Sequence, residues 1–266
     1  MTDISRLTSD TLSKKKVKNI LITQAKPENE KSPYFELAKK HQVNLEFESF
    51  ISVVPIPSKE FRKQKIDIAA FSAVIFTSRN SIENFFRTCE EMRITVSPDT
   101  KYFCISESVA LYLQKFTLYR KRKVFYGDDG TNASLFAEIS KFKDQEKFLY
   151  PCSESFDSEI TNWLIANHCT YAIPVLYEII SNDIKEIVNK HTYEIICFFS
   201  PLGVRSLKEN FPKFSQNGTL IGAFGDNTRK AVLAAGLNPD IIAPQPKAPS
   251  MIAALDQYLS SLSKAK

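Results

Sequence analysis

Hydroxyl side chains follow two apolar segments of the sequence, each at a point where a helix is predicted to begin. The first segment ends in Phe76-Thr77-Ser78-Arg79-Asn80, and the second ends in Phe199-Ser200-Pro201-Leu202-Gly203. The N–H groups of a first helical turn, together with the positive end of the helix dipole, favour anionic oxygens. Serine is also a favoured helix N-cap, so both interpretations of Ser78 and Ser200, cap and anion ligand, stay open.

A third junction of this kind contains a glycine. In Ala223-Phe224-Gly225-Asp226-Asn227-Thr228, Gly225 permits close approach of a ligand to the backbone, and Thr228 is placed either to cap the helix or to bind. The corresponding segment in the first half of the chain is Ile105-Ser106-Glu107-Ser108-Val109, where Ser106 and Ser108 supply the hydroxyl groups. These four junctions are the candidate binding positions.

Familiar catalytic and cofactor motifs do not occur in the sequence. It has no G-x-G-x-x-G, no G-x-x-x-x-G-K-[ST] and no G-x-S-x-G pattern, so dinucleotide, P-loop and α/β-hydrolase chemistry lack support. The 5 cysteines are an odd number without a C-x-x-C pair, which argues against a disulfide framework and a zinc site. The 3 histidines are dispersed along the chain. We therefore expect no metal and no cofactor.

Composition indicates a globular protein of one large or two smaller α/β domains. The 266 residues are 43% hydrophobic and 24% charged, and the net charge is 35 − 30 = +5, which permits a polyanionic partner without requiring one. The basic run Arg120-Lys121-Arg122-Lys123 lacks interleaved aromatic residues, so we expect an exposed loop and no nucleic-acid partner. No apolar run approaches the ~20 residues of a membrane span. Residues 1–17 are expected to be a loose tail without a secretory signal, in a cytoplasmic protein.

Short apolar segments alternate with amphipathic helical patterns along the chain. Ala73-Val74-Ile75-Phe76, for example, is continuously apolar and precedes a helical pattern over residues 80–92. The other predicted strands are 20–23, 45–50, 102–105, 147–150, 171–180, 195–199, 220–224 and 241–242, and the other predicted helices are 34–40, 107–116, 157–167, 202–210, 227–235 and 250–262. Continuous apolar strands separated by helices are typical of an α/β fold, in which helices cover both faces of parallel sheets.

The chain also repeats itself in a fixed order. Four segments of one half match four of the other at slowly drifting offsets: Leu37…His41…Phe50 with Leu164…His168…Tyr177, Val74–Ser78 with Ile196–Ser200, Ser106…Leu118 with Gly225…Leu237, and Asn132–Leu135 with Ala248–Met251. Each match alone is weak, but their common order indicates an internal duplication. We therefore expect two related α/β lobes, with the ligand between them.

The ordered set of these segments resembles the uroporphyrinogen-III synthase family of tetrapyrrole biosynthesis over about residues 19–259. The resemblance rests on Val74–Glu83, Leu149-Tyr150-Pro151-Cys152, Pro174-Val175-Leu176-Tyr177, Phe198–Val204, Gly225-Asp226-Asn227-Thr228 and Ala248–Met251. It implies two HemD-like, flavodoxin-like lobes with parallel sheets, joined by a two-stranded β-ladder. One lobe would be discontinuous, residues 1–50 and 178–266, and the other would be continuous, residues 51–177.

The resemblance also implies an activity. A member of this family converts the linear tetrapyrrole hydroxymethylbilane, which carries eight carboxylates, into uroporphyrinogen III with loss of water and inversion of ring D through a spiro-pyrrolenine, without a cofactor. Tyr177 falls on the family's tyrosine, which is thought to assist departure of the hydroxyl group. Binding of the carboxylates would fall to groups at Thr77, Ser78, Arg79, Ser106, Ser108, Ser200, Pro201, Gly203, Gly225, Asn227 and Thr228. We expect a monomer with transient contact to hydroxymethylbilane synthase.

Two departures from the family pattern leave an alternative open. The family's Gly-x-x-Thr is replaced in the continuous lobe by Ser106-Glu107-Ser108-Val109, and Gln24-Ala25-Lys26 lacks the commonly seen arginine. Without the threonine hydroxyl, a non-catalytic module that binds a tetrapyrrole or another anion is the second interpretation. A two-lobed small-molecule receptor of periplasmic type is the third, and the absence of a signal segment argues against it.

Overall fold

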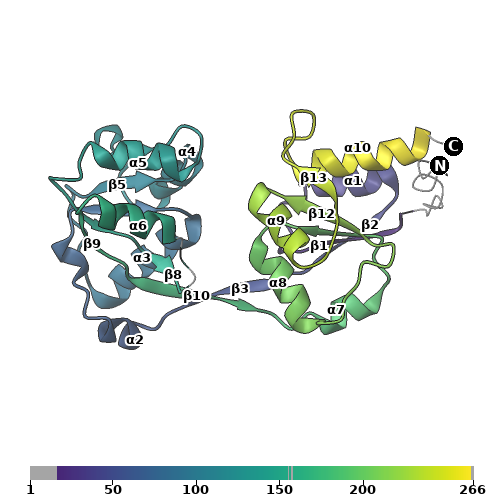
Figure 1. Cartoon of the computed structure of the whole chain (residues 1–266), viewed down its shortest axis with the longest axis horizontal. Coiled ribbons are helices and arrows are strands. Elements are labelled where there is room, and N and C mark those ends of the chain that lie inside the picture. Colours follow the sequence, from purple (N-terminus) through teal and green to yellow (C-terminus); the bar gives the residue numbers. More distant parts are fainter. Residues whose placement is uncertain (1–16, 155, 157, 265–266) are drawn as a thin grey trace, which may run out of the picture. The chain divides into compact units, whose positions relative to one another are not determined.

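The computed structural model describes residues 17–154, 156 and 158–264, and it divides the chain into two compact units (Figure 1). Unit 1 is Met1–Ser52 with Ser181–Lys266, and unit 2 is Val53–Ile180. The boundaries expected from the sequence, after residues 50 and 177, lie two and three residues earlier. The tail expected at residues 1–17 lies outside the described residues, apart from residue 17.

Unit 1 is built on a five-stranded sheet whose paired strands are all parallel, in the order β13-β12-β11-β1-β2. The strands are β1 (Asn19–Ile22), β2 (Asn44–Phe47), β11 (Ile195–Phe198), β12 (Leu220–Phe224) and β13 (Pro239–Ala243). The helices are α1 (Pro33–His41), α7 (Lys185–Lys190), α8 (Pro201–Asn210), α9 (Asp226–Ala234) and α10 (Met251–Lys264). Renumbered within the unit, the strand order is 2-1-3-4-5, which is flavodoxin-like.

Unit 2 has a second five-stranded parallel sheet, in the order β6-β5-β4-β7-β9. Its strands are β4 (Ala73–Phe76), β5 (Lys101–Cys104), β6 (Val124–Tyr126), β7 (Lys147–Leu149) and β9 (Thr170–Ala172). Its helices are α2 (Ser58–Lys63), α3 (Arg79–Met92), α4 (Glu107–Tyr112), α5 (Asn132–Ser140) and α6 (Ser158–Ala166). If β7 and β9 are counted as the first two strands, the order is again 2-1-3-4-5, which supports the predicted duplication.

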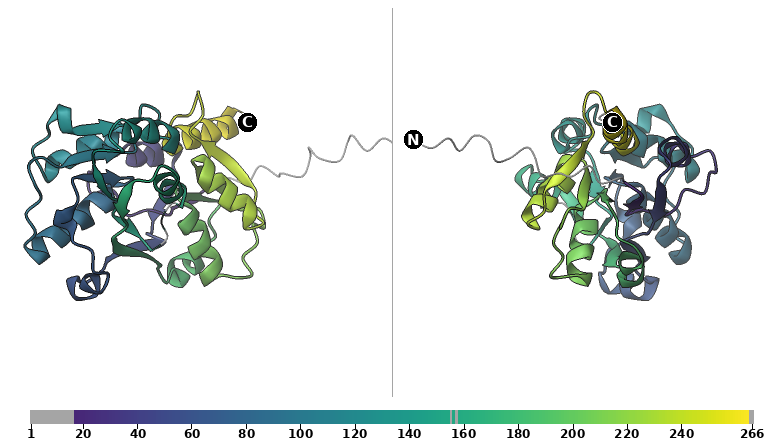
Figure 2. Two further views of the ribbon diagram at one scale, coloured as in Figure 1. Left: turned by 60° about the vertical axis from the view of Figure 1, so that its left-hand side comes forward. Right: turned by 90° about the vertical axis from the view of Figure 1, so that its right-hand side faces the viewer.

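Alternation of apolar side chains explains why both faces of each sheet carry helices. In β1, Ile20 and Ile22 face the core under α1 and α10, whereas Leu21 faces the core under α8 and α9. In unit 2, Phe76 packs under α3 and α4, and Phe103 packs under α5 and α6. Figure 2 shows helices on both faces of the sheet within each unit. The α/β fold with parallel sheets is therefore confirmed.

Two strands carry the chain from one unit to the other. They are β3 (Ile51–Pro55) and β10 (Val175–Ser181), and they are neighbours in a three-stranded sheet that also contains the short β8 (Cys152–Ser153). The amide N–H of Asn182 donates to Phe50 O (3.0 Å), and that of Ile56 donates to Leu176 O (2.9 Å). Each pair of residue numbers has the same sum, so β3 and β10 are antiparallel. The two strands predicted to join the lobes are therefore present, and a third strand that was not predicted, β8 of unit 2, pairs with β10.

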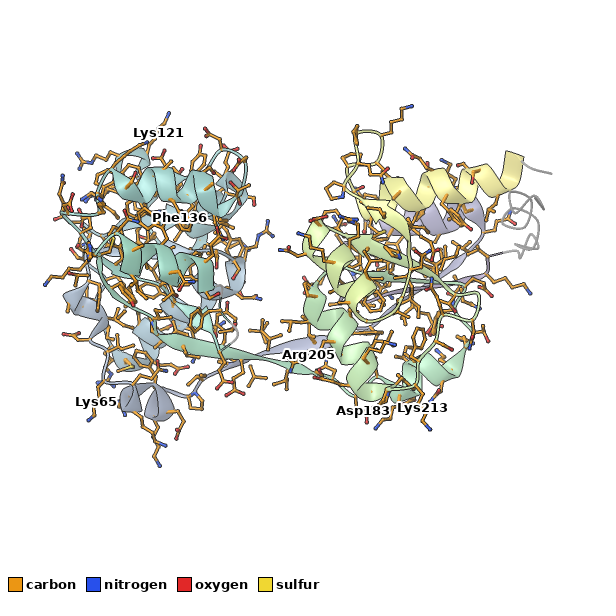
Figure 3. All side chains as sticks on the ribbon, in the orientation of Figure 1. Lys65, Lys121, Phe136, Asp183, Arg205 and Lys213 are labelled. Carbon is orange, nitrogen blue, oxygen red and sulfur yellow. The ribbon has the colours of Figure 1, made fainter. Side chains whose placement is uncertain are left out.

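Two further predictions need correction. The strand predicted over residues 171–180 is broken, because Pro174 has no N–H to donate; β9 ends at Ala172 and β10 begins at Val175. The basic run predicted as a loop contains a 3₁₀ turn, Lys121–Lys123, in which Lys123 Nζ donates to Pro98 O (2.6 Å) and pairs with Asp99. Lys121, labelled in Figure 3, is exposed as expected.

Candidate functional site

In each unit the strand order reverses at one place, between two neighbouring strands whose following helices lie on opposite faces of the sheet. In unit 1 this is between β1, which leads to α1, and β11, which leads to α8. In unit 2 it is between β7, which leads to α6, and β4, which leads to α3. Ligands of open α/β sheets bind at such switch points, beyond the carboxyl ends of the strands. Ser200 and Ser78 follow β11 and β4 at these two positions.

Ser78 is the N-cap of α3, so the capping interpretation is correct. Its extended backbone (φ −157°, ψ 163°) lets Oγ accept a hydrogen bond from the N–H of Ser81 at 3.1 Å. The Ser81 hydroxyl in turn accepts from the N–H of Ser78 (3.3 Å) and donates to Ser78 O (2.7 Å). The N–H groups of Arg79 and Asn80, in the first helical turn, have no acceptor within the helix by geometry, so α3 begins with donors available to an anion.

Tyr177 lies beside this cap. Its side chain extends from β10, is only 5% exposed, and places Oη 3.5 Å from Ser78 Oγ. Burial raises the pKa of the phenol, the hydrogen bond with Ser78 lowers it, and the nearby Cys152 adds to the rise. The net effect is a raised pKa, so the phenol holds its proton at neutral pH. Of the predicted site residues in unit 2, these two are brought into contact across 99 positions of sequence.

The strand that carries Tyr177 is held by side chains of its own unit. Gln64 bonds the backbone of Val175 in both directions, donating to its carbonyl (2.7 Å) and accepting from its N–H (3.0 Å). Arg87 Nη2 donates to Leu176 O (3.4 Å), which also accepts from the N–H of Ile56 (2.9 Å). The backbone on the N-terminal side of Tyr177 is therefore fixed against α2 and α3.

Thr77 and Arg79 flank Ser78. Thr77, directly after β4, is half-buried, and Arg79 is an exposed residue at the first position of α3. The Arg79 guanidinium lies over the ring of Tyr112, 5.2 Å from its centroid, and the Tyr112 hydroxyl donates to Glu83. Arg79 is thus a cation at the start of α3, and its guanidinium makes a cation–π contact with Tyr112.

The second junction of unit 2 differs from what the anion-binding prediction requires. Ser106 is the N-cap of α4 but makes no capping hydrogen bond with its side chain; its Oγ lies 3.1 Å from the hydroxyl of the exposed Ser108. Glu107 stands between them and accepts from the Tyr126 hydroxyl (3.4 Å). No described cation lies within 4.0 Å of Glu107. A carboxylate without a neutralising cation here disfavours an anion.

The equivalent of the Ser78 cap in unit 1 is Ser200. Its Oγ accepts from the N–H of Gly203 (3.2 Å), and Pro201 occupies the first turn of α8, where a missing N–H has no cost. Thr23, which follows β1 and is 7% exposed, donates to Cys197 O (2.9 Å). A methyl group added at Gly203 would lie 3.6 Å from Ser200 Oγ and 3.7 Å from Thr23 Oγ1, so these three residues are neighbours.

Thr23 was missed by the sequence analysis as a site residue. It was included in a predicted strand, yet it stands directly after the apolar run of β1 as Thr77 stands directly after β4. A search for strand-end hydroxyls in every strand would have found it.

The junction after β12 combines a strained glycine with a buried threonine. Gly225 has φ 85° and ψ 152°, a region that only glycine adopts readily. Asn227 is exposed, and Thr228 is 2% exposed at the third position of α9. The hydrogen bonds from Arg229, and then Lys230, hold the pKa of Asp226 below its usual range. In contrast to Glu107, the acid of this junction is neutralised.

Three comparisons with known proteins bear on this arrangement. The family model of uroporphyrinogen-III synthase HemD matches residues 32–253. The chain belongs to this family. A comparison with curated proteins found no match. Among solved structures, a mutant uroporphyrinogen III synthase from the extremely thermophilic bacterium Thermus thermophilus aligns with a TM-score of 0.61 at 14% identity, covering 94% of this chain and 100% of that one.

A second solved structure extends the likeness. Uroporphyrinogen-III synthetase from Helicobacter pylori aligns with a TM-score of 0.60 at 18% identity, covering 92% of this chain and 100% of that chain. At these identities the two structures establish that the HemD chain shares their fold, and the family match places it in tetrapyrrole biosynthesis. Within the described residues, no helix is both long and apolar enough to span a membrane.

Proposed function

We propose that this HemD-family protein cyclises hydroxymethylbilane to uroporphyrinogen III, with loss of water and inversion of ring D. The observation that carries the proposal is the buried, protonated phenol of Tyr177 beside the capped start of α3. It stands at the switch point of unit 2, in a chain whose family match covers residues 32–253. A neutral phenol in such a place suits a proton donor at neutral pH.

Helix starts in both units would hold the carboxylates of the substrate. α3 and α9 present first-turn N–H groups, α8 presents that of Leu202, and each helix has the positive end of its dipole at the carboxyl edge of a parallel sheet. Side chains at the same positions would add hydrogen bonds or charge, and the proposed set is Thr77, Arg79, Ser200, Asn227 and Thr228. Pro201 has no N–H, and the N–H groups of Gly203 and Gly225 already donate to Ser200 Oγ and Ala243 O, so these three residues would contribute only space for close approach. Ser106 and Ser108 would contribute least, because Glu107 lies between them.

The proposed reaction depends mainly on how the protein positions the two ends of the substrate. The C–O bond of the hydroxymethyl group breaks with its electron pair going to oxygen, and the Tyr177 phenol donates the proton that turns the leaving group into water. The remaining cation is attacked by the substituted carbon of ring D, so a spiro-pyrrolenine forms and then rearranges. The last step removes one proton from a ring carbon, and that proton restores the phenol. No cofactor enters this balance.

Incubation with freshly prepared hydroxymethylbilane tests the proposal. After oxidation, chromatography separates the porphyrin isomers, and we expect isomer III to dominate with the native protein and isomer I to dominate with heat-denatured protein. Isomer I alone, at the buffer rate, would exclude the proposed activity.

The junction of Ser106 and Ser108 favours a second candidate, a module that binds tetrapyrroles without turnover. Saturable binding of a non-reactive bilane, together with formation of isomer I alone, would identify it.

A further inference from the structure

The hydroxyl group of Ser78 is held in place by the hydrogen bond that it accepts, and its own proton remains available for a second hydrogen bond. Its Oγ accepts from the N–H of Ser81 at 3.1 Å, and the reciprocal bonds of Ser81 hold the Ser78 backbone. A hydroxyl has one proton and two acceptor sites, so after capping it can still donate. The Tyr177 phenolic oxygen lies 3.5 Å away in the half-buried junction.

Both hydroxyls sit on elements that do not shift easily. Ser78 caps the first turn of a 14-residue helix, and Tyr177 follows backbone groups that Gln64 and Arg87 bind. Tyr177 is also in register with Ser153 on the parallel strand β8. Supporting contacts of this kind are what holds a reacting group in one geometry.

The other half of the duplication shows that a cap needs no phenol. Ser200 caps α8 in the same way as Ser78 caps α3, by accepting from the third N–H of its helix. Phe50 O and Leu176 O accept equivalent bonds from Asn182 and Ile56, so Phe50 corresponds to Leu176 and the place of Tyr177 is taken in unit 1 by Ile51. Unit 1 therefore has an aliphatic residue without a hydroxyl at this place, and the contact between Ser78 and Tyr177 is an addition of unit 2.

We infer that Ser78 is a positioning residue for the reaction: its hydroxyl donates to Tyr177 Oη, which turns the phenolic proton away from Ser78 and toward the leaving hydroxyl group. This inference rests on the proposed function. When the phenol gives its proton to the leaving oxygen, the phenolate keeps the hydrogen bond from Ser78, and the Ser81 N–H polarises that donor. The positive end of α3 stabilises the same negative charge. Burial and the hydrogen bond act on the pKa of Tyr177 in opposite directions, as this role requires.

Three variants separate positioning from capping and from substrate contact. Ser78→Ala removes the donor, Ser78→Thr restores a hydroxyl that still caps a helix, and Thr131→Ala removes a different cap of unit 2, the one on α5. With hydroxymethylbilane, we expect kcat of Ser78→Ala to fall by about 10-fold, as for loss of one neutral hydrogen bond, with KM changed by less than about 2-fold. Ser78→Thr should recover most of kcat, and Thr131→Ala should leave kcat unchanged.

A spectroscopic titration gives a readout that does not depend on activity. A fluorinated tyrosine at position 177 is more acidic than tyrosine, and its fluorine resonance reports ionisation of this phenol alone. We expect Ser78→Ala to raise its pKa further, whereas Ser78→Thr and Thr131→Ala leave it unchanged. This arm stands even if the protein does not form isomer III, so the inference and the proposed function fail separately. An unchanged pKa in Ser78→Ala, or a raised KM at unchanged kcat, would overturn the positioning role.

Discussion

Replacing Tyr177 by phenylalanine removes one oxygen atom and leaves the buried ring in place. Among the described residues, the hydroxyl makes a single long hydrogen bond, 3.5 Å to Ser78, so its loss should cost no more than ~1 kcal/mol of unfolding free energy. The variant should therefore be folded, and any change in rate reports chemistry.

The expected rate loss follows from what the phenol does. A positioned proton donor contributes about 10²–10⁴-fold, but the hydroxyl group of hydroxymethylbilane also departs without an enzyme, so we expect kcat to fall by ~10- to 100-fold. KM should change little, because the proposed carboxylate contacts lie at other residues. The assay is initial rate of isomer III formation over a range of substrate concentrations, corrected for spontaneous isomer I. Full retention of kcat in Tyr177→Phe would refute the role of the phenol.

The pH dependence of kcat gives an independent check on the role of Tyr177. Burial raises the pKa of Tyr177, so the donor form persists above the usual titration range of a phenol. We therefore expect no loss of kcat from this group as the pH rises from about 7 to 9. A fall of kcat in that range that disappears in Tyr177→Phe would show that the phenol ionises earlier than its burial predicts.

Three further predictions concern binding and stability. Thr228→Ala should raise KM by ~3- to 10-fold with kcat retained, measured in the same isomer assay; loss of isomer inversion instead would contradict a binding role. Gly225→Ala should lower the unfolding free energy by about 1–3 kcal/mol in urea titrations, because φ is 85° and ψ is 152° at this residue. Gly203→Ala is the control: the added methyl group would make ordinary contacts, so it should not destabilise the protein. Burial raises the pKa of all 5 cysteine thiols, so at alkaline pH the folded state keeps thiol protons that the unfolded state loses. The urea concentration at the unfolding midpoint should therefore fall as the pH rises from about 8 to 10.5. A midpoint that rises with pH would exclude this linkage.

Much of the fold was predictable because buried parallel strands leave a direct trace in sequence. The apolar run Ala73–Phe76 is identical with β4, and the hydroxyl after it marks the start of α3. Capping at Ser78 and Ser200 follows from local chemistry, so one residue type and its neighbours were enough. Short edge elements leave a weaker trace: β6 is three residues long, and neither it nor α5 was predicted.

The contact that matters most for the site was not predictable from local sequence. Tyr177 and Ser78 meet because the register of β10 against β8 shifts between Val175 and Tyr177, and because Pro174 separates β10 from β9, which pairs with β7. A shift of one residue would turn the phenol to the other face. The break at Pro174 was missed. The predicted match of Phe50 with Tyr177 was wrong by one residue, because Phe50 O and Leu176 O are the equivalent acceptors in the ladder.

The two units share one strand order, but differences between their junction residues suit them to different functions. At the second junction of unit 1, Asp226 is neutralised by Arg229 and Lys230, so the start of α9 keeps its attraction for an anion. At the matched place of unit 2, Glu107 accepts only from a tyrosine among the described residues, so its charge repels one. Conversely, unit 2 has Tyr177 where unit 1 has Ile51. A duplication that began with two equivalent anion sites would diverge in this way if one half came to bind carboxylates more firmly while the other supplied the acid.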